Sequence, residues 1–203
     1  KIDGHVLSHP DVILQEMHLQ PGNSLLAIQP AKIEKALLRQ PWIEQAELTR
    51  LWPDRVHIQI KEHEPLALVK LGEKLYLMDT KGILFKAMEP IDPHDFPVLT
   101  GLQTENFERA EGNMTPLLAK VFDFIELLKN KNNPINLATI SEINVDPERG
   151  LTIYPSDLNM GVSIGFQGHS HKLANLQKVL PHLKQSGDLA NIEKIDLNYP
   201  QRV

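Results

Sequence analysis

The chain has 203 residues, of which 41% are hydrophobic and 23% charged, a balance typical of soluble globular domains and unlike that of disordered chains. The net charge is −5 and no stretch concentrates Lys and Arg, so nucleic acid is not an expected partner. Cysteine is absent, which excludes disulfides and thiolate chemistry.

The first third of the chain is expected to form two helices and a hairpin. Apolar spacing predicts a short helix that begins near His9 and ends at Pro21, and a second helix that begins near Pro30 and stops before Pro41. From residue 43 to residue 60 the apolar residues alternate with polar ones, which predicts two strands around a turn at 52–55. The opening residues 1–7 are a candidate third strand.

The two tryptophans, Trp42 and Trp52, flank the first of these strands. Each has apolar and turn residues beside it, so we expect both to pack in the core of the first module or against its hairpin. A role as exposed binding anchors is the less favoured alternative.

Short strands and two helices are predicted in the rest of the chain. The helices cover 117–128, behind Thr115-Pro116, and 173–183, where Pro181 predicts a kink or an early stop. The predicted strands are 66–71, 75–78, 83–85, 140–145, 151–154, 160–166 and 192–199.

These patterns predict an α+β protein with two domains. Residues 1–64 are expected to place two helices on a small sheet, and residues 65–203 to form a mostly antiparallel β domain with two helices. The joint is placed near Pro65, after the hairpin.

Catalytic and metal-binding motifs are not apparent. Gly161, Gly165 and Gly168 match no phosphate-binding fingerprint and are expected in turns and bulges. His169 and His171 lack the spacing of a metal site, and Ser170 has no nucleophile motif around it. We therefore expect no enzyme activity, no cofactor and no metal.

Several segments resemble the FtsQ/DivIB family of cell division proteins. Residues 22–26 read GNSLL and residues 41–67 read PWIEQAELTRLWPDRVHIQIKEHEPLA, similar to the polypeptide-transport-associated (POTRA) domain of this family. Residues 77–85 (LMDTKGILF), 96–101 (FPVLTG) and 195–203 (IDLNYPQRV) resemble the β domain that follows it. The resemblance spans nearly the whole chain.

The resemblance implies a non-catalytic scaffold of the divisome. Such a protein crosses the inner membrane once and places its folded part in the periplasm, where it recruits the subunits FtsB and FtsL to the septum. The membrane helix of the family precedes the POTRA domain and no apolar run of that length is present, so we expect this chain to be an excised extracytoplasmic portion.

The expected binding site is the end of the chain, where a terminal edge strand receives a strand of the FtsB-like partner. Arg149 is added from the resemblance alone, as a contact for an acidic partner helix. Asn198 stands where the family commonly has an arginine, and His63 departs from the family in the same way. The candidate partner-binding residues are Tyr199, Asn198, Leu197, Gln201, Val203 and Arg149.

Two alternatives remain at this stage. A POTRA-bearing transport or outer-membrane assembly protein would also carry such a domain, but usually in repeats or ahead of a membrane barrel. An envelope hydrolase would require a nucleophile or a carboxylate pair, and the sequence offers neither in a recognisable setting.

Overall fold

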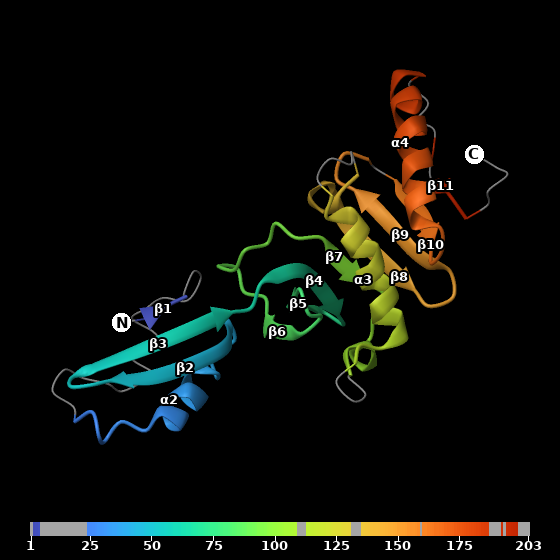
Figure 1. Cartoon of the computed structure of the whole chain (residues 1–203). Coiled ribbons are helices and arrows are strands. Elements are labelled where there is room, and N and C mark those ends of the chain that lie inside the picture. Colours follow the sequence, from blue (N-terminus) through green and yellow to red (C-terminus); the bar gives the residue numbers. More distant parts are fainter. Residues whose placement is uncertain are drawn as a thin grey trace. The chain divides into compact units, whose positions relative to one another are not determined.

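The computed structural model describes residues 2–4, 24–108, 113–130, 135–158, 160–186, 192 and 194–198. The chain divides into two compact units, Lys1–Pro65 (unit 1) and Leu66–Val203 (unit 2), and each unit has its own apolar cluster (Figure 1). The helix expected between His9 and Pro21 lies outside the described residues.

Unit 1 is a three-stranded sheet with a helix packed on it. Strands β2 (Ile43–Leu51) and β3 (Arg55–Glu62) form the predicted antiparallel hairpin, and β1 (Ile2–Asp3) pairs with β3 in parallel. The strand order is β1-β3-β2, so β2 is an edge strand. Helix α2 (Pro30–Leu37) covers β2, as the apolar spacing predicted.

The core of unit 1 follows from the two periodicities in its sequence. Pro30 is in the first turn of α2, where its missing N–H costs nothing, and the helix buries Ile33 and Leu37 one turn apart. The strands add every second residue from one face. The buried cluster consists of Ile28, Ile33, Leu37, Ile43, Leu48, Ile58 and Ile60.

The prediction that both tryptophans pack in unit 1 is wrong for Trp52. Its side chain is 67% exposed, and Trp42 is half-buried. The last cross-strand pair of the hairpin is Leu51 with Arg55, so Trp52 belongs to the turn beyond it and has no opposing side chain on the sheet. The apolar residues that flank Trp52 in the sequence therefore led to a wrong prediction that its ring is buried.

Unit 2 is built on one eight-stranded sheet with the order β11-β10-β9-β8-β7-β4-β5-β6. Its strands are β4 (Pro65–Leu71), β5 (Lys74–Asp79), β6 (Leu84–Ala87), β7 (Val98–Thr100), β8 (Ile140–Asp146), β9 (Gly150–Pro155), β10 (Gly161–Gly165) and β11 (Lys194–Asp196).

The α+β class is confirmed, and the sheet of unit 2 proves to be mixed. Antiparallel pairing joins β5 to β6, β8 to β9 and β9 to β10. Parallel pairing joins β4 to β7, β7 to β8 and β10 to β11. Parallel neighbours need a crossover, and the segments that carry α3 and α4 supply two of them.

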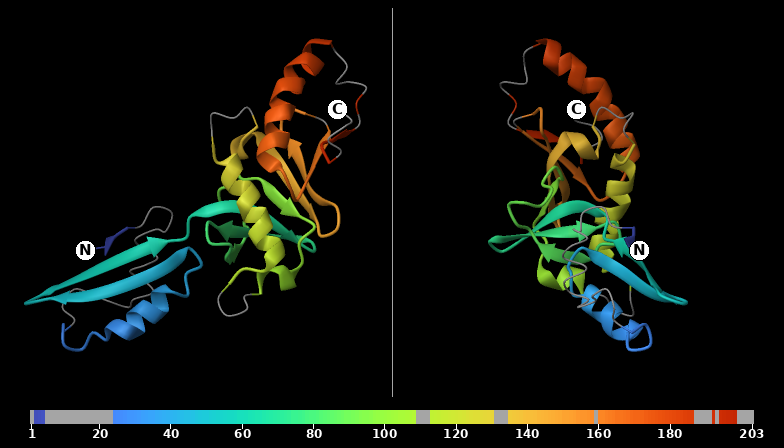
Figure 2. Two further views of the ribbon diagram at one scale, coloured as in Figure 1. Left: turned by 45° about the vertical axis from the view of Figure 1, so that its right-hand side comes forward. Right: turned by 90° about the vertical axis from the view of Figure 1, so that its left-hand side faces the viewer.

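The two predicted helices of unit 2 lie on one face of the sheet (Figure 2). Helix α3 (Pro116–Leu128) begins at Thr115, whose hydroxyl accepts the N–H of Leu118. Helix α4 (His169–Ser186) continues past Pro181, so the expected early stop is wrong. A proline inside a helix removes one backbone bond without necessarily ending the helix.

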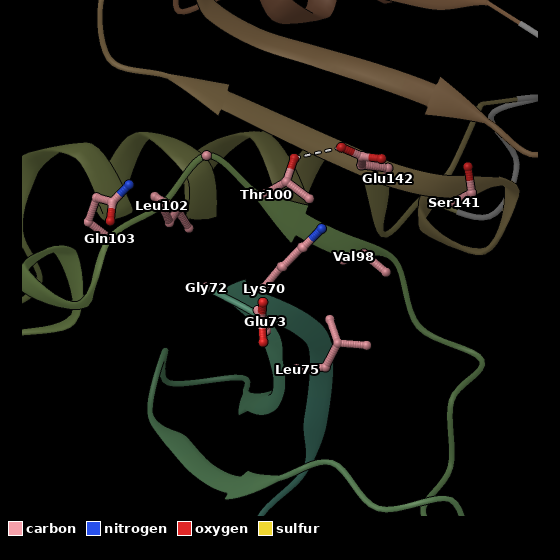
Figure 3. Close-up of a pocket in the computed structure, with 11 residues that line it drawn as sticks. Lys70, Gly72, Glu73, Leu75, Val98, Thr100, Leu102, Gln103, Ser141 and Glu142 are labelled. Atoms are coloured by element: carbon pink, nitrogen blue, oxygen red, sulfur yellow. Dashed lines mark hydrogen bonds between the residues drawn. The ribbon is translucent and has the colours of Figure 1, made fainter.

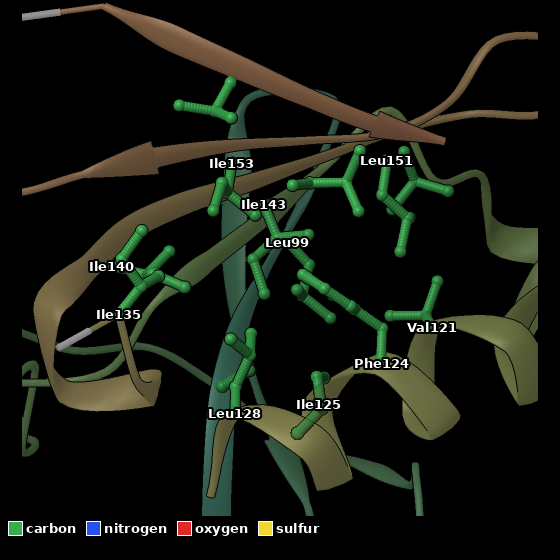
Figure 4. Packing of buried hydrophobic residues seen from close by; sticks show 14 of the residues in the cluster. Leu99, Val121, Phe124, Ile125, Leu128, Ile135, Ile140, Ile143, Leu151 and Ile153 are labelled. Atoms are coloured by element: carbon green, nitrogen blue, oxygen red, sulfur yellow. The ribbon is translucent and has the colours of Figure 1, made fainter. Parts of the chain in front are cut away.

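An apolar row crosses five strands beneath these helices. Its members lie directly opposite one another in register and are Leu99, Ile143, Ile153, Val162 and Ile195. Figure 4 shows Leu99, Ile143 and Ile153 packed towards Phe124 of α3, and the exposed fraction of each of these four side chains is 0%. One face of the sheet is therefore core, and the next residue along each strand faces the other way.

Candidate partner-binding surface

A polar row crosses the same five strands on the face away from the helices. Each member is the neighbour in sequence of a residue of the apolar row and is paired directly with the next member across the sheet. The row consists of Thr100, Asn144, Thr152, Ser163 and Asp196. Strand alternation thus gives this half of the sheet one apolar and one polar face.

Hydrogen bonds join the members of the row. The amide of Asn144 donates to Oγ1 of Thr100 at 2.8 Å, and that hydroxyl donates to Glu142 at 2.6 Å. The hydroxyls of Thr152 and Ser163 lie 3.3 Å apart. Ser163 is only 5% exposed, so its hydroxyl needs a protein partner of this kind.

The surface is hollowed where the row meets the end of the chain. A concavity of about 530 Å³ opens over β8 to β11, and two of the predicted site residues, Arg149 and Asn198, line it together. Among the described residues, its lining consists of Asn144, Asp146, Arg149, Thr152, Ser163, Lys194, Asp196 and Asn198. Residues 49 positions apart in the sequence are therefore brought to one site.

Arg149 is placed by the turn between β8 and β9. Asp146 accepts the backbone N–H groups of Glu148 and Arg149 at 2.8 and 2.9 Å. Hydrogen bonds from Arg149 and then Glu148 hold the pKa of the Asp146 carboxyl below its usual value. Gly150 follows at φ +93°, and a Cβ there would lie 2.4 Å from Cα of Gly165, so only glycine fits.

Asn198 is held by Lys172 of α4. The Lys172 ammonium donates to Oδ1 of Asn198 at 3.1 Å and to the carbonyl of Ile164 at 2.6 Å. Burial lowers the pKa of Lys172, and the Asp196 carboxylate offsets part of this effect. A Cβ on Gly165 would lie 2.2 Å from Oδ1 of Asn198, so a glycine is needed for this close approach.

The terminal strand β11 lies at one end of the sheet and pairs only with β10 among the described strands. Leu197 continues the ladder by donating its N–H to the carbonyl of Ser163 at 2.9 Å. Because backbone groups alternate in direction along a strand, the N–H groups of Asp196 and Asn198 point to the open side. That of Asn198 is bonded to the carboxylate of Asp196 at 2.9 Å.

The remaining predicted site residues have different placements. Leu197 is 7% exposed and belongs to the core cluster, and its N–H is bonded to Ser163 of β10, so its side chain and its N–H both face away from the open side of β11. Tyr199, Gln201 and Val203 lie outside the described residues.

Lys172, Lys194 and Asp196 were missed by the sequence analysis. Polar residues at alternate positions of apolar strands could have indicated the row that includes Asp196. Nothing in a single sequence points to Lys172, because its role depends on how α4 packs against β10.

A second hollow of about 830 Å³ lies on the sheet of unit 2, between the β4–β5 hairpin and strands β7 and β8. Figure 3 shows Lys70 and Glu73 on one side of it and the bonded pair Thr100 and Glu142 on the other. The charges are mixed, and none of the predicted partner-binding residues is among the described residues that line it.

His169 and the buried Asp92, two side chains of types that can bind metals, have partners within the protein. His169 lies 3.0 Å from the carbonyl of Gly165 and packs edge-on against Phe124. Asp92 is 4% exposed and is bonded by Lys86 at 2.6 Å. In the described part of the chain, no three potential ligands gather around one point, and no helix is long and apolar enough to cross a membrane.

Family models match both units. The model of the FtsQ-type POTRA domain matches residues 1–63, and that of the C-terminal region of cell division protein FtsQ/DivIB matches residues 67–198. These matches cover most of the chain and agree with the resemblance seen in its motifs.

Curated relatives carry the corresponding names. The cell division protein FtsQ of Anaeromyxobacter sp. (strain K) is 34% identical over 196 residues, which are 97% of this chain and 66% of that protein. FtsQ of Geotalea daltonii is 28% identical, covering 91% of this chain and 66% of its own length. DivIB of Clostridium acetobutylicum is 21% identical, covering 81% and 64%. The chain thus spans about two thirds of each relative, and it belongs to the FtsQ/DivIB family of cell division proteins.

Proposed function

We propose that this chain is a non-catalytic scaffold of the divisome that binds FtsB- and FtsL-like subunits through the open edge of β11. The observation that supports this proposal is the position of β11 at the end of the sheet, beside a polar concavity lined by Arg149 and Asn198. An edge strand offers backbone donors and acceptors to an added strand, and the hollow beside it supplies specificity.

The binding mode follows from the direction of the backbone groups. The outward groups of Lys194 and Asp196 are the nearest partners for an added strand. The N–H of Asn198 becomes available only when the Asp196 carboxylate releases it. Arg149 and Lys194 line the hollow together with Asp146 and Asp196, and these two cations attract an acidic segment of the partner next to its strand.

A membrane anchor belongs to this proposal. We place a single membrane-spanning helix ahead of residue 1 and both units in the periplasm at the division septum, and the membership of the chain in the FtsQ/DivIB family supports this placement. The alternative of a transport or outer-membrane assembly protein gains no support, because the module after the POTRA-type unit matches the C-terminal region of the division family.

The test is a binding measurement with a partner segment. The C-terminal segment of an FtsB-like subunit, alone and with the FtsL-like subunit, is titrated into the 203-residue chain by calorimetry. Tyr199→Glu is expected to abolish binding and leave the melting temperature unchanged, because it adds a charge at the predicted strand interface.

Ala87→Glu is the matched control. Ala87 is exposed on β6, the strand at the opposite end of the same sheet, so the same charge there should leave the affinity unchanged. Wild-type affinity in Tyr199→Glu, or loss of binding only in Ala87→Glu, would reject the proposed edge. Steady turnover of peptidoglycan by the purified chain would reject a purely non-catalytic role.

A further inference from the structure

The turn between β2 and β3 in unit 1 presents apolar side chains to solvent. Trp52 is 67% exposed and Leu51 is 46% exposed. They follow each other at the end of the hairpin, where Leu51 belongs to the last cross-strand pair, with Arg55, and Trp52 to the turn beyond it. Single exposed leucines are ordinary on protein surfaces, but an exposed indole ring with an apolar neighbour marks an interaction site.

A third exposed apolar side chain belongs to the segment that leads into α2. Leu26 is 72% exposed and lies two residues before Ile28. Arg50, next to the turn, donates to the carbonyl of Ile28 at 2.5 Å and ties this segment to the hairpin. We call the three exposed side chains the hairpin-tip patch: Leu26, Leu51 and Trp52.

The start of the chain enters unit 1 beside this patch. Strand β1 runs parallel to β3, with Ile2 opposite Ile58 and Asp3 opposite Gln59. Moving back from Asp3 to Ile2 therefore leads towards Arg55, the first residue of β3 after the turn. Ile58 is three residues from Arg55, about 10 Å along a strand.

We propose that the hairpin-tip patch contacts the lipid surface of the membrane to which the protein is anchored. This inference rests on the proposed function, in which the anchor precedes residue 1. Because β1 runs from the hairpin end of β3, an anchor connected through β1 brings the hairpin turn towards the lipid headgroups. The indole of Trp52 suits that depth, because its apolar body and its N–H favour the boundary between lipid and water.

The charges beside the patch fit a lipid headgroup layer. The side chain of Arg55 is 82% exposed, so its guanidinium can reach lipid phosphates while Leu51 and Trp52 face the acyl chains. Asp54 lies 3.7 Å from Arg55 and is 76% exposed. The weak, open pairing of these two side chains leaves the guanidinium accessible.

The size of the patch favours lipid over a protein partner. A stable protein interface buries roughly 800 Å² on each side, whereas one tryptophan offers at most about 250 Å². Three exposed apolar side chains are too few for a lasting protein contact. A tethered domain needs only weak contacts with lipid, because the anchor keeps its effective concentration at the bilayer high.

The experiment uses the fact that the chain has two tryptophans. Trp42→Phe leaves Trp52 as the only indole, and Trp52→Phe leaves Trp42. Each variant of the full chain carries an N-terminal histidine tag and is attached to vesicles of phosphatidylethanolamine and phosphatidylglycerol that contain a nickel-chelating lipid. Tryptophan emission is recorded with ordinary and with brominated lipids.

The expected result is specific to Trp52. On the vesicles its emission shifts to shorter wavelength and is quenched by brominated lipids, while the emission of Trp42 in Trp52→Phe is unchanged. If Trp42→Phe impairs folding, the difference between the wild-type chain and Trp52→Phe gives the same signal. A solvent-like, unquenched Trp52 overturns the proposal, as does a shift that appears only when a division subunit is added.

Binding of the FtsB-like segment to the same tethered chain separates this inference from the proposed function. Binding without a Trp52 signal rejects only the membrane contact. A Trp52 signal without binding rejects the scaffold and supports the contact with lipid.

Discussion

The two sheets of the molecule differ in which groups bond the outward backbone N–H groups of their edge strands. In unit 1 the N–H of Leu48 on the edge strand β2 donates to the carboxylate of Glu34 on α2 at 2.9 Å, so a side chain of the helix occupies this edge. In unit 2 the edge strand β11 has one strand neighbour among the described strands, and the N–H of Asn198 donates to the short side chain of Asp196. The two edges have similar backbone groups but differ in how readily a partner strand can displace the side chain bonded to them.

This difference indicates which edge strand can accept a strand from a partner. An unprotected edge invites pairing with other chains, and proteins usually blunt it with charges or cover it. A carboxylate fixed on a packed helix blocks an edge at low entropic cost. The Asp196 carboxylate belongs to the strand itself, so a partner strand can displace it without unfolding a neighbouring element. We expect β11 to be the binding edge and β2 to be the protected one.

The largest expected effect comes from detaching β11. Leu197 is 7% exposed in the core of unit 2, and Leu197→Ala should lower the free energy of unfolding by about 2–5 kcal/mol. Chemical denaturation measures this loss. Binding of the partner segment should fall with it, because the strand that receives the partner is no longer held. Full stability in this variant would show that the end of the chain is not anchored as described.

Opening the protected edge should have the next largest effect. Glu34→Ala removes the acceptor of the Leu48 N–H and should cost about 1–3 kcal/mol. It should also make unit 1 prone to pair with itself, which sedimentation velocity detects as association that rises with protein concentration. Lys35→Ala, at the exposed neighbouring position, is the control and should change stability by less than about 0.5 kcal/mol. A monomeric Glu34→Ala chain would contradict the protective role of Glu34.

Loosening the support of the open edge should have a smaller effect. Lys172→Met removes the donor to Asn198 and to the carbonyl of Ile164, which should cost about 1 kcal/mol. Amide exchange at Asn198 should become faster and partner affinity weaker. Lys178→Met, on an exposed position of the same helix, should change neither. If the two variants behave alike, Lys172 does not position the site.

The smallest effect concerns the turn that carries Arg149. The pKa of Asp146 is lowered in the folded chain by backbone hydrogen bonds, so this carboxylate stabilises the fold above its unfolded pKa of about 3.9. That contribution is lost as the pH falls through the lower folded value. An NMR titration should find Asp146 titrating below an ordinary aspartate, and Asp146→Asn should flatten the acid limb of the stability curve. An ordinary pKa would show that the turn is not ordered by these bonds.

Much of the fold could be read from the sequence because its strands and helices follow clear periodicities. The hairpin of unit 1 and helices α2, α3 and α4 lie where apolar spacing predicted them. The mixed sheet could not be foreseen, because the pairing of β4, β7 and β8 depends on crossovers rather than on local pattern. The burial of Trp52 was wrongly predicted for a related reason, because its exposure depends on where the strand pairing stops.

The candidate site was only partly predictable. Arg149 and Asn198 were named from the resemblance, and the structure places both on one hollow. The contribution of Lys172 depends on the packing of α4 against β10, and that of Glu34 on the packing of α2 against β2. Such contacts join residues that are distant in the sequence, as Glu34 and Leu48 are, and no spacing rule in a single chain connects them.

The most direct test of the central claim is hydrogen exchange of the backbone with and without the FtsB-like segment. We expect new protection at Lys194–Asp196 and Asn198 in the complex, with no change in β2 of unit 1 or in β6 at the far end of the sheet of unit 2. Protection confined to β2 or β6, with β11 exchanging as freely as before, would contradict it.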